Sequence, residues 1–350
     1  MTELLSGHTT FRVGGPAQNF AVAETEEELI DIVRTCDSYA EPVLVLGGGS
    51  NMLVSDAGFP GTVVKVAVKG IKTEDVMACS GAFVTVAAGE VWDDFAAYCA
   101  DQAVDRQGFV GVEALAGIPG LVGATPIQNV GAYGQEVNQT IARVRTFDRQ
   151  TGLIRTFTAL ECYFGYRSSI FKRETVTAGG SRWVVLSVSF QFPLGKLSAP
   201  VRYAELASAL GIGTGERAPL AEVRAAVLEL RRGKGMLLDP ADHDTWSAGS
   251  FFTNPVISPE QAAALPADAP RYDAPGGRVK TSAAWLIDHA GFGKGYGTPP
   301  ATLSTKHVLA LTNRGGATAA QLVALKDEIT QGVLAKFGIT LEVEPNLVGF

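Results

Sequence analysis

Residues 118–134 read Ile-Pro-Gly-Leu-Val-Gly-Ala-Thr-Pro-Ile-Gln-Asn-Val-Gly-Ala-Tyr-Gly. Glycine and proline are too frequent here for a helix or a central strand, yet the apolar residues distinguish the stretch from a solvated linker. Its glycines permit close backbone approach, and Thr125, Gln128 and Asn129 add hydroxyl and amide groups. We predict a loop that lies directly against a polar ligand; a tight crossing between two buried layers is the alternative.

A second glycine-rich loop occurs earlier in the chain. Residues 42–46, Pro-Val-Leu-Val-Leu, are typical of a buried strand and run into Gly47-Gly48-Gly49-Ser50-Asn51. Consecutive glycine N–H groups after a strand form a concave nest for phosphate oxygens, to which Ser50 and Asn51 add donors. The Rossmann fingerprint is excluded because the chain resumes as a strand, not a helix. Two such loops predict one long phosphorylated ligand held from two sides, with a plain hairpin or bulge as the alternative for Gly47 to Asn51.

Composition limits the class of protein. The chain has 350 residues, 46% of them hydrophobic and 19% charged, which is typical of an ordinary globular enzyme with two or three domains. A net charge of −7 argues against nucleic acid and anionic membranes as partners. We find no apolar run of ~20 residues and no signal peptide in residues 1–10. We therefore expect a cytoplasmic protein, and we expect it to be a monomer.

The cysteines and histidines do not form a recognisable metal pattern. Cys36, Cys79, Cys99 and Cys162 show no C-x-x-C pairing and lie in apolar surroundings, so we expect buried reduced thiols. The four histidines are scattered. We expect no metal site.

The first two thirds of the chain predict an α+β arrangement. A capping box at Thr25 and Glu28 starts a helix over 25–36. A further helix is expected over 91 to about 104, and 183–192 is the longest strand signal. Shorter strands are expected over 42–46, 52–55, 62–66, 83–88, 143–147 and 153–157, the last two as an antiparallel hairpin.

The last third predicts a separate α/β unit. Helices are expected over 221–232, 282–289 and 318–337, and strands over 307–311 and 339–348. Alternation along the closing strand places Glu342 and Glu344 on the same face.

Two short segments are candidates for chemistry. Gly249-Ser250-Phe251-Phe252 places a hydroxyl among aromatic residues, where it is suited to donate a proton. The segment lacks the G-x-S-x-G elbow of serine hydrolases, and His243 is an unsupported base. Arg167, beside a glycine and two serines, is suited to clamp a carboxylate and stabilise charge on it. Each of these residues also has a structural explanation. Arg167 is then a surface or ion-pairing residue, Glu342 and Glu344 lie on the solvated face of a strand, and Lys234 interacts with the dipole at the C-terminus of a helix.

Taken in order, five motifs resemble the UDP-N-acetylenolpyruvoylglucosamine reductase family over about residues 9–349. The motifs are Gly47 to Asn51, residues 118–134, Phe164-Gly165-Tyr166-Arg167, Gly249-Ser250-Phe251-Phe252 and a glutamate-bearing C-terminal strand. The resemblance implies an FAD-binding domain of the vanillyl-alcohol-oxidase type, made of two α+β subdomains, and a C-terminal α/β substrate domain. By this resemblance we expect FAD-binding subdomains at 1–67, joined by about 345–350, and 68–218, and a substrate domain at 219–344.

The resemblance also implies a reaction and its residues. NADPH reduces FAD, flavin N5 passes hydride to C3 of UDP-N-acetylglucosamine enolpyruvate, Ser250 protonates C2, Arg167 stabilises the enolate charge, and Glu344 assists, giving UDP-N-acetylmuramate for peptidoglycan synthesis. The residues implied to bind FAD are Gly47, Gly48, Gly49, Ser50, Asn51, Ile118, Pro119, Thr125, Gln128, Gly131, Ala132 and Tyr133. Those implied to bind substrate are Tyr166, Tyr203, Lys234 and Asn254, with Tyr203 as in the first of the two family types.

The sequence departs from the family pattern at a few positions. Thr253 stands where lysine is usual, and the loop over 235–248 is longer than usual, which affects the placement of Lys234. The ending Leu-Glu-Val-Glu-Pro leaves Glu342 as an alternative to Glu344. Two other functions stay open. One is an FAD-dependent oxidase of another sugar or alcohol, although neither glycine loop contains the His or Cys that often tethers its flavin. The other is a flavin-binding module without catalysis, which predicts loss of Ser250 or Arg167.

Overall fold

The fold is described from a computed structural model, which covers residues 3–77, 79–101, 107–176 and 180–350. The chain forms two compact units. One unit, here called the sheet unit, comprises residues 17–48 and 60–232. The other, here called the terminal unit, combines residues 1–16, 49–59 and 233–350. Each unit therefore has its own core and is described by itself.

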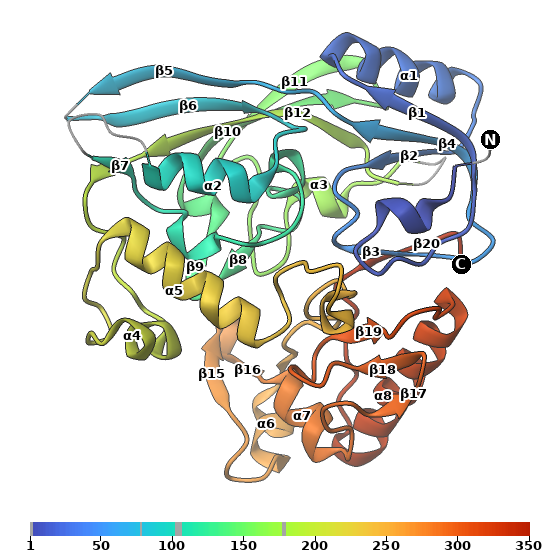
Figure 1. The fold of residues 1–350 in the computed structure, drawn as a ribbon, viewed down its shortest axis with the longest axis vertical. Coiled ribbons are helices and arrows are strands. Elements are labelled where there is room, and N and C mark those ends of the chain that lie inside the picture. Colours follow the sequence, from blue (N-terminus) through green and yellow to red (C-terminus); the bar gives the residue numbers. More distant parts are fainter. Residues whose placement is uncertain (1–2, 78, 102–106, 177–179) are drawn as a thin grey trace. The chain divides into compact units, whose positions relative to one another are not determined.

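The sheet unit is built on a five-stranded sheet with the order β11-β10-β12-β6-β5. All neighbours in it are antiparallel. Figure 1 shows these strands as one twisted layer with the helix α2 along it. The strands are β5 (Ile71–Met77), β6 (Gly81–Ala87), β10 (Ile141–Asp148), β11 (Leu153–Thr158) and β12 (Trp183–Phe192).

A smaller sheet in the same unit has the order β1-β4-β2, in which β2 and β4 are parallel. Its strands are β1 (Ala17–Ala23), β2 (Val43–Leu46) and β4 (Phe59–Val66). Two separate pairs of short strands are β7 (Gly108–Phe109) with β13 (Leu194–Gly195), and β8 (Gly131–Ala132) with β9 (Gln135–Glu136). The helices are α1 (Glu26–Ser38), α2 (Trp92–Asp101), α3 (Ile170–Arg173), α4 (Ala204–Leu210) and α5 (Leu220–Gly233).

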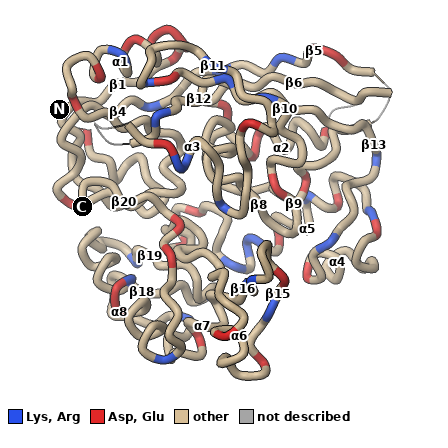
Figure 2. Tube along the Cα trace, turned by 180° about the vertical axis from the view of Figure 1, so that it is seen from behind, with Lys and Arg blue, Asp and Glu red and all other residues tan. Residues whose placement is uncertain are grey.

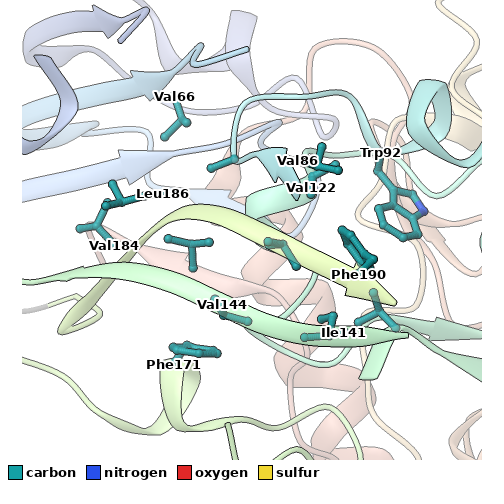
Figure 3. Close-up of a cluster of buried hydrophobic side chains, with 14 of the residues drawn as sticks. Val66, Val86, Trp92, Val122, Ile141, Val144, Phe171, Val184, Leu186 and Phe190 are labelled. Atoms are coloured by element: carbon teal, nitrogen blue, oxygen red, sulfur yellow. The ribbon is translucent and has the colours of Figure 1, made fainter. Parts of the chain in front are cut away.

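Residues 118–134 contribute to the core of the sheet unit, together with the strands. Figure 3 shows Val122 beside Val86, with Trp92 and Phe190 close by, and Val144 on the neighbouring strand. The Trp92 and Phe190 rings lie 6.3 Å apart, and Trp92 Nε1 donates to the Leu115 carbonyl. Val122 is fully buried, and further apolar residues of the stretch pack against the same cluster, namely Ile118, Leu121, Ile127, Val130 and Ala132. The ends of the stretch are therefore held in place by the same apolar packing that stabilises the sheet.

The terminal unit joins distant parts of the chain. Strand β3 (Met52–Val54) pairs in parallel with β20 (Asn346–Val348). Two three-stranded sheets, β14-β16-β15 and β17-β18-β19, and the long helix α8 complete it. The remaining bounds are β14 (Val256–Ile257), α6 (Pro259–Ala264), β15 (Arg271–Ala274), β16 (Arg278–Thr281), α7 (Ala283–His289), β17 (Gly297–Thr298), β18 (Ala301–Leu303), β19 (Leu311–Asn313) and α8 (Ala319–Phe337).

Most predicted elements are confirmed. Helix α1 has the expected capping box at Thr25 and Glu28, and β12 spans the predicted residues. The hairpin of β10 and β11 is antiparallel as expected. The predicted end of α2 near residue 104 lies outside the described residues. The sequence analysis missed strands β1 and β5. Their residues do not alternate regularly between buried and exposed positions, and both strands are stabilised by pairing with their neighbours in the sheets.

Two strand predictions are wrong. Residues 307–310 form a turn, because Ser304 Oγ accepts from the N–H groups of Lys306 and His307, and the strand begins only at Leu311. The closing strand predicted over 339–348 is regular only from Asn346 to Val348. Pro345 has no N–H to contribute to a ladder, so pairing is interrupted there. Of the two glutamates, Glu342 is exposed and Glu344 half-buried.

The cysteine prediction is confirmed in three places and wrong in one. Cys36, Cys99 and Cys162 are buried free thiols, whereas Cys79 is exposed. Burial raises the pKa of the Cys162 thiol to about 12. These buried thiols are therefore poor nucleophiles at neutral pH.

Figure 2 shows acidic and basic residues interspersed along both units rather than gathered by sign. Across the part of the chain that the structure describes, every helix is too short or too polar to cross a membrane.

Candidate functional site

The glycine loop after β2 lies against the stretch 118–134. A Cβ on Gly48 would lie 2.8 Å from Gly120 Cα, closer than real Cβ contacts allow. The backbone of the stretch is further held by N–H donations from Val122 to Glu90 O and from Gly123 to Ala88 O. The two loops thus lie together within the sheet unit, as a single ligand held by both would require. Close crossing also explains the glycines in part, as the alternative interpretation held.

Gly47 differs from Gly48 in having space. A Cβ placed there would meet nothing nearer than Leu121 Cδ1 at 3.8 Å, an ordinary contact. The chain itself therefore does not require glycine at this position. A ligand that approaches the backbone closely is a sufficient reason for it.

The end of the stretch forms a tight hairpin. β8 and β9 pair with Ala132 opposite Gln135, and Tyr133 and Gly134 make the turn with φ of 48° and 82°. Positive φ at both central residues defines a type I′ turn, in which glycine is favoured at the second position. Burial raises the Tyr133 pKa to about 12, against a smaller opposing effect of Arg231. The hairpin thus presents the Gly131 and Ala132 backbone on a rigid support.

Arg167 is placed by a second turn that contacts this hairpin. Gly165 and Ser168 exchange backbone hydrogen bonds of 2.9 and 3.2 Å, which leaves Tyr166 and Arg167 at the tip, Arg167 with φ of 51°. Arg167 Nη2 donates to Gly131 O at 2.8 Å. The guanidinium is therefore aimed along the backbone that we predicted to bind FAD.

Asn129 connects the two turns. Its side chain is fully buried, and Nδ2 donates to Gly165 O at 3.1 Å and to Glu136 Oε2 at 2.9 Å. Its Oδ1 accepts from Asn138 N at 3.2 Å. The sequence analysis proposed this amide for a ligand, but the side chain serves the loop itself. Thr125 is similar, since its hydroxyl donates to Val122 O at 2.8 Å and only its lone pairs are left to accept.

The other predicted residues of the sheet unit lie near these turns. Ile118 packs against the buried core beside Pro119, and Gln128 is half-buried next to Asn129. Tyr203 is 44% exposed, and its ring meets that of Tyr133 edge-on at 5.5 Å.

In the terminal unit, the Ser250 segment pairs with the Glu344 segment. Phe252 lies opposite Val343, Glu344 N donates to Phe251 O at 2.9 Å, and Thr253 N donates to Glu342 O at 3.0 Å. This register sets Glu344 opposite Phe251, one residue from Ser250, and Glu342 opposite Thr253 on the other side. Glu344 is thus nearer to Ser250 than Glu342 is.

The segment around Glu344 also contacts residues 49–51 of the glycine loop that follows β2. Asn51 Nδ2 donates to Glu344 O at 3.4 Å, and Asn346 N donates to Asn51 O at 3.0 Å. Gly49, with φ of 60°, has its carbonyl bonded by Thr10 N at 3.1 Å. The loop residues 49–51, Ser250 and Glu344 therefore share one framework.

Two predicted substrate residues sit at helix ends. Asn254 Oδ1 accepts from Ala283 N at 3.0 Å at the start of α7, so its oxygen has a capping role. Lys234 directly follows α5 and is half-buried.

Known proteins resemble both parts of the chain. Residues 17–158 match the FAD binding domain model, and residues 239–348 match the model of the UDP-N-acetylenolpyruvoylglucosamine reductase C-terminal domain. A UDP-N-acetylenolpyruvoylglucosamine reductase of Cutibacterium acnes is 58% identical, with 97% of this chain and 88% of that protein covered. The chain belongs to the UDP-N-acetylenolpyruvoylglucosamine reductase family.

Further relatives agree. The reductase of Thermobifida fusca is 52% identical over 99% of this chain and 96% of its own. The crystal structure of the Thermus caldophilus reductase has a TM-score of 0.62 at 26% identity, covering 99% of this chain and 98% of that chain. The predicted family, the α+β fold with an FAD-binding domain, the flavin-dependent reductase activity in peptidoglycan synthesis and the cofactors FAD and NADPH are thereby confirmed. The oxidase and the non-catalytic module are not supported.

Proposed function

We propose that Arg167, Ser250 and Glu344 carry out the chemical step of the reductase reaction in this chain. The substrate is a small UDP-sugar, and the family assigns the overall reaction. The observation that best supports the proposal is the register of the terminal unit, which sets Glu344 opposite Phe251, next to Ser250. Asn51 is bonded to that same glutamate backbone.

The glycine loops fit the pyrophosphate and backbone contacts of FAD. A side chain at Gly47 would make only an ordinary contact with Leu121, whereas a side chain at Gly48 would collide with the backbone of Gly120. Bound FAD supplies hydride chemistry, with NADPH as the source of the hydride. We propose that the N–H groups of this loop, Asn51 and the Gly131–Ala132 backbone hold it.

Arg167 is proposed to stabilise negative charge on the substrate carboxylate. A guanidinium offers a planar pair of donors, and that geometry suits a carboxylate whose charge increases as an enolate forms. The hydrogen bond to Gly131 O and the tight turn fix where the guanidinium lies. Little reorientation is then needed when charge develops.

Ser250 is proposed to give its proton to C2 of the enolate. Its neighbours Phe251 and Phe252 are fully buried or nearly so, which limits water beside the hydroxyl. Glu344, next to it in register, is proposed to assist at the same end of the substrate. Glu342 remains the alternative, but it lies opposite Thr253 instead.

We also propose that Tyr166, Tyr203, Lys234 and Asn254 bind substrate. We propose that the chain divides, by what each part binds, into FAD-binding subdomains at 1–67 with about 345–350 and at 68–218, and a substrate domain at 219–344. The two compact units follow packing within the chain and do not test this division. A monomer in the cytoplasm likewise stays a prediction.

Anaerobic spectroscopy tests the chemical roles. The purified protein is mixed first with NADPH and then with UDP-N-acetylglucosamine enolpyruvate, and the flavin absorbance is followed. We expect Ser250→Ala to be reduced by NADPH at the wild-type rate but to reoxidise with the enolpyruvyl nucleotide slower by at least about 100-fold. Equal slowing of both half-reactions would show that Ser250 is not the proton donor.

A further inference from the structure

Glu113 is a buried carboxylate that the roles above leave unused. Only 2% of it is exposed. It follows β7 within a run of apolar residues, so ionising it there is costly unless donors surround it. Gly111 N donates to Oε2 at 2.6 Å, and Gln135 Nε2 and Ala199 N donate to Oε1 at 2.9 and 2.7 Å. These donors satisfy the charge and at the same time join three chain segments.

Gln135 closes the set from the other side. It is 7% exposed, and its Oε1 accepts from Ala114 N at 2.8 Å while its Nε2 donates to Glu113. Each of the three contacts to Glu113 is an N–H group. A carboxylate, with two accepting oxygens and no donor, is the side chain that fits all three.

The joined segments carry two of the proposed ligand-binding tyrosines. Gln135 stands two residues after Tyr133 in the β8–β9 hairpin, and Ala199 stands four residues before Tyr203. The two rings meet edge-on at 5.5 Å. A fixed distance between Gln135 and Ala199 therefore fixes how the two rings face each other.

We propose that Glu113 is a positioning residue that ties the Tyr203 segment to the flavin-side hairpin through Ala199 N. This inference rests on the proposed function, in which Tyr203 binds the UDP-sugar and the hairpin binds FAD. The carboxylate sets the resting place of Tyr203, so that substrate binding starts from an ordered segment. Loss of the Ala199 bond alone costs affinity for the nucleotide without affecting reduction of the flavin.

Two variants separate the Ala199 bond from the charge itself. In Glu113→Gln, the amide turns its NH2 toward Gly111, and its oxygen still accepts from Gln135 and Ala199. In the double variant Glu113→Gln with Gln135→Glu, the NH2 turns toward the new carboxylate and faces Ala199 N, which then has no acceptor. The double variant conserves the net charge and approximate volume of the wild type. Glu113→Gln, which has one negative charge fewer but keeps the Ala199 bond, and the wild type are therefore both used as controls.

Hydrogen exchange and kinetics then test the proposal. We expect faster amide exchange over 196–203 in the double variant than in Glu113→Gln, with 131–137 equally protected in both. We expect KM for the enolpyruvyl nucleotide to rise about tenfold in the double variant, with flavin reduction by NADPH unchanged.

Different failures have different meanings. If the double variant matches Glu113→Gln in both exchange and KM, or if exchange increases only at 111–114, the positioning role is wrong. Failure of the wild-type protein to reoxidise with the enolpyruvyl nucleotide would instead refute the proposed function. In that event the exchange comparison still decides whether Glu113 ties the two segments.

Discussion

Replacing Gly47 with alanine tests whether glycine is required at this position for folding of the chain or for binding of FAD. A Cβ at this position meets only Leu121 Cδ1, at 3.8 Å, and Gly47 does not have a positive φ. The protein without FAD should therefore accept the methyl group. FAD, if its phosphates lie on the Gly47 N–H, should not, because the methyl group would occupy the space through which they approach.

The structure allows both effects to be estimated. A Gly→Ala change at a compatible φ stabilises a protein by about 0.4–1 kcal/mol, so we expect the apoprotein to be as stable as wild type or slightly more so. Loss of one hydrogen bond to a charged group costs about 1.5–3 kcal/mol. We therefore expect FAD to bind about 10-fold to 100-fold more weakly.

Two further glycine-to-alanine variants serve as comparisons: we expect one to destabilise the apoprotein and the other to have little effect. In Gly49→Ala, the Cβ would lie 1.8 Å from His8 O and φ is 60°, so the apoprotein itself must rearrange and lose stability. The positive φ alone costs about 1–2 kcal/mol. In Gly293→Ala, the nearest atom is Asp288 Oδ1 at 3.9 Å, and neither stability nor FAD affinity should change.

Apoprotein is prepared for each variant, its thermal unfolding is recorded, and FAD is titrated by the quenching of flavin fluorescence. The expected pattern is a stable Gly47→Ala apoprotein with weakened FAD binding and a destabilised Gly49→Ala apoprotein. Wild-type FAD affinity in Gly47→Ala would refute the placement of FAD on this loop. Unfolding of Gly47→Ala would refute the reading of its surroundings.

Three further predictions concern single side chains. Glu344→Gln should slow reoxidation by the enolpyruvyl nucleotide at least about tenfold while Glu342→Gln leaves it unchanged, and stopped-flow absorbance would reveal the reverse order. Asn129→Asp turns an oxygen of a buried side chain toward two acceptors, Glu136 Oε2 at 2.9 Å and Gly165 O at 3.1 Å, so we expect a loss of about 2–6 kcal/mol in unfolding free energy; a loss under 1 kcal/mol in denaturant titration would contradict it. The bidentate bond from Arg182 lowers the pKa of Asp148, so its stabilisation is present above the unfolded pKa of about 3.9 and is lost as pH falls through the folded value. Asp148→Asn should therefore be about 2 kcal/mol less stable than wild type at pH 7, and the difference should shrink as pH falls below about 3.9; a difference independent of pH would exclude this explanation.

The sequence predicted those elements whose signals are local. Thr25 and Glu28 cap a helix within one turn, and the run 183–192 has strand character along its whole length, so both were found with accurate bounds. The loops around Gly47 and 118–134 were recognised because glycine and proline exclude regular structure whatever lies nearby. Order along the chain then identified the family.

Partners distant in sequence were beyond this reasoning. Nothing near Asn129 indicates that its amide bonds Gly165 O, so it was assigned to a ligand instead of to the loop. Likewise, the alternation of 339–348 predicted one strand, because the pairing of Val343 with Phe252 is not visible in the sequence; Pro345 was a local signal of the interruption that was overlooked. Glu113 offered a signal that was overlooked: it is an acidic residue in an apolar run, which requires buried donors.

The composition of the terminal unit has a consequence for how the protein is made. Residues 17–48 and 60–232 of the sheet unit are synthesised before residues 233–350, which make up most of the terminal unit. Strand β3, directly after Asn51, has its partner in β20 (Asn346–Val348), far along the chain. Domains fold as units while the ribosome proceeds from the N-terminus. Residues 49–51 thus reach their final surroundings only after β20 has been synthesised, so we expect a chain that lacks β20 to be impaired at the loop that we propose binds FAD.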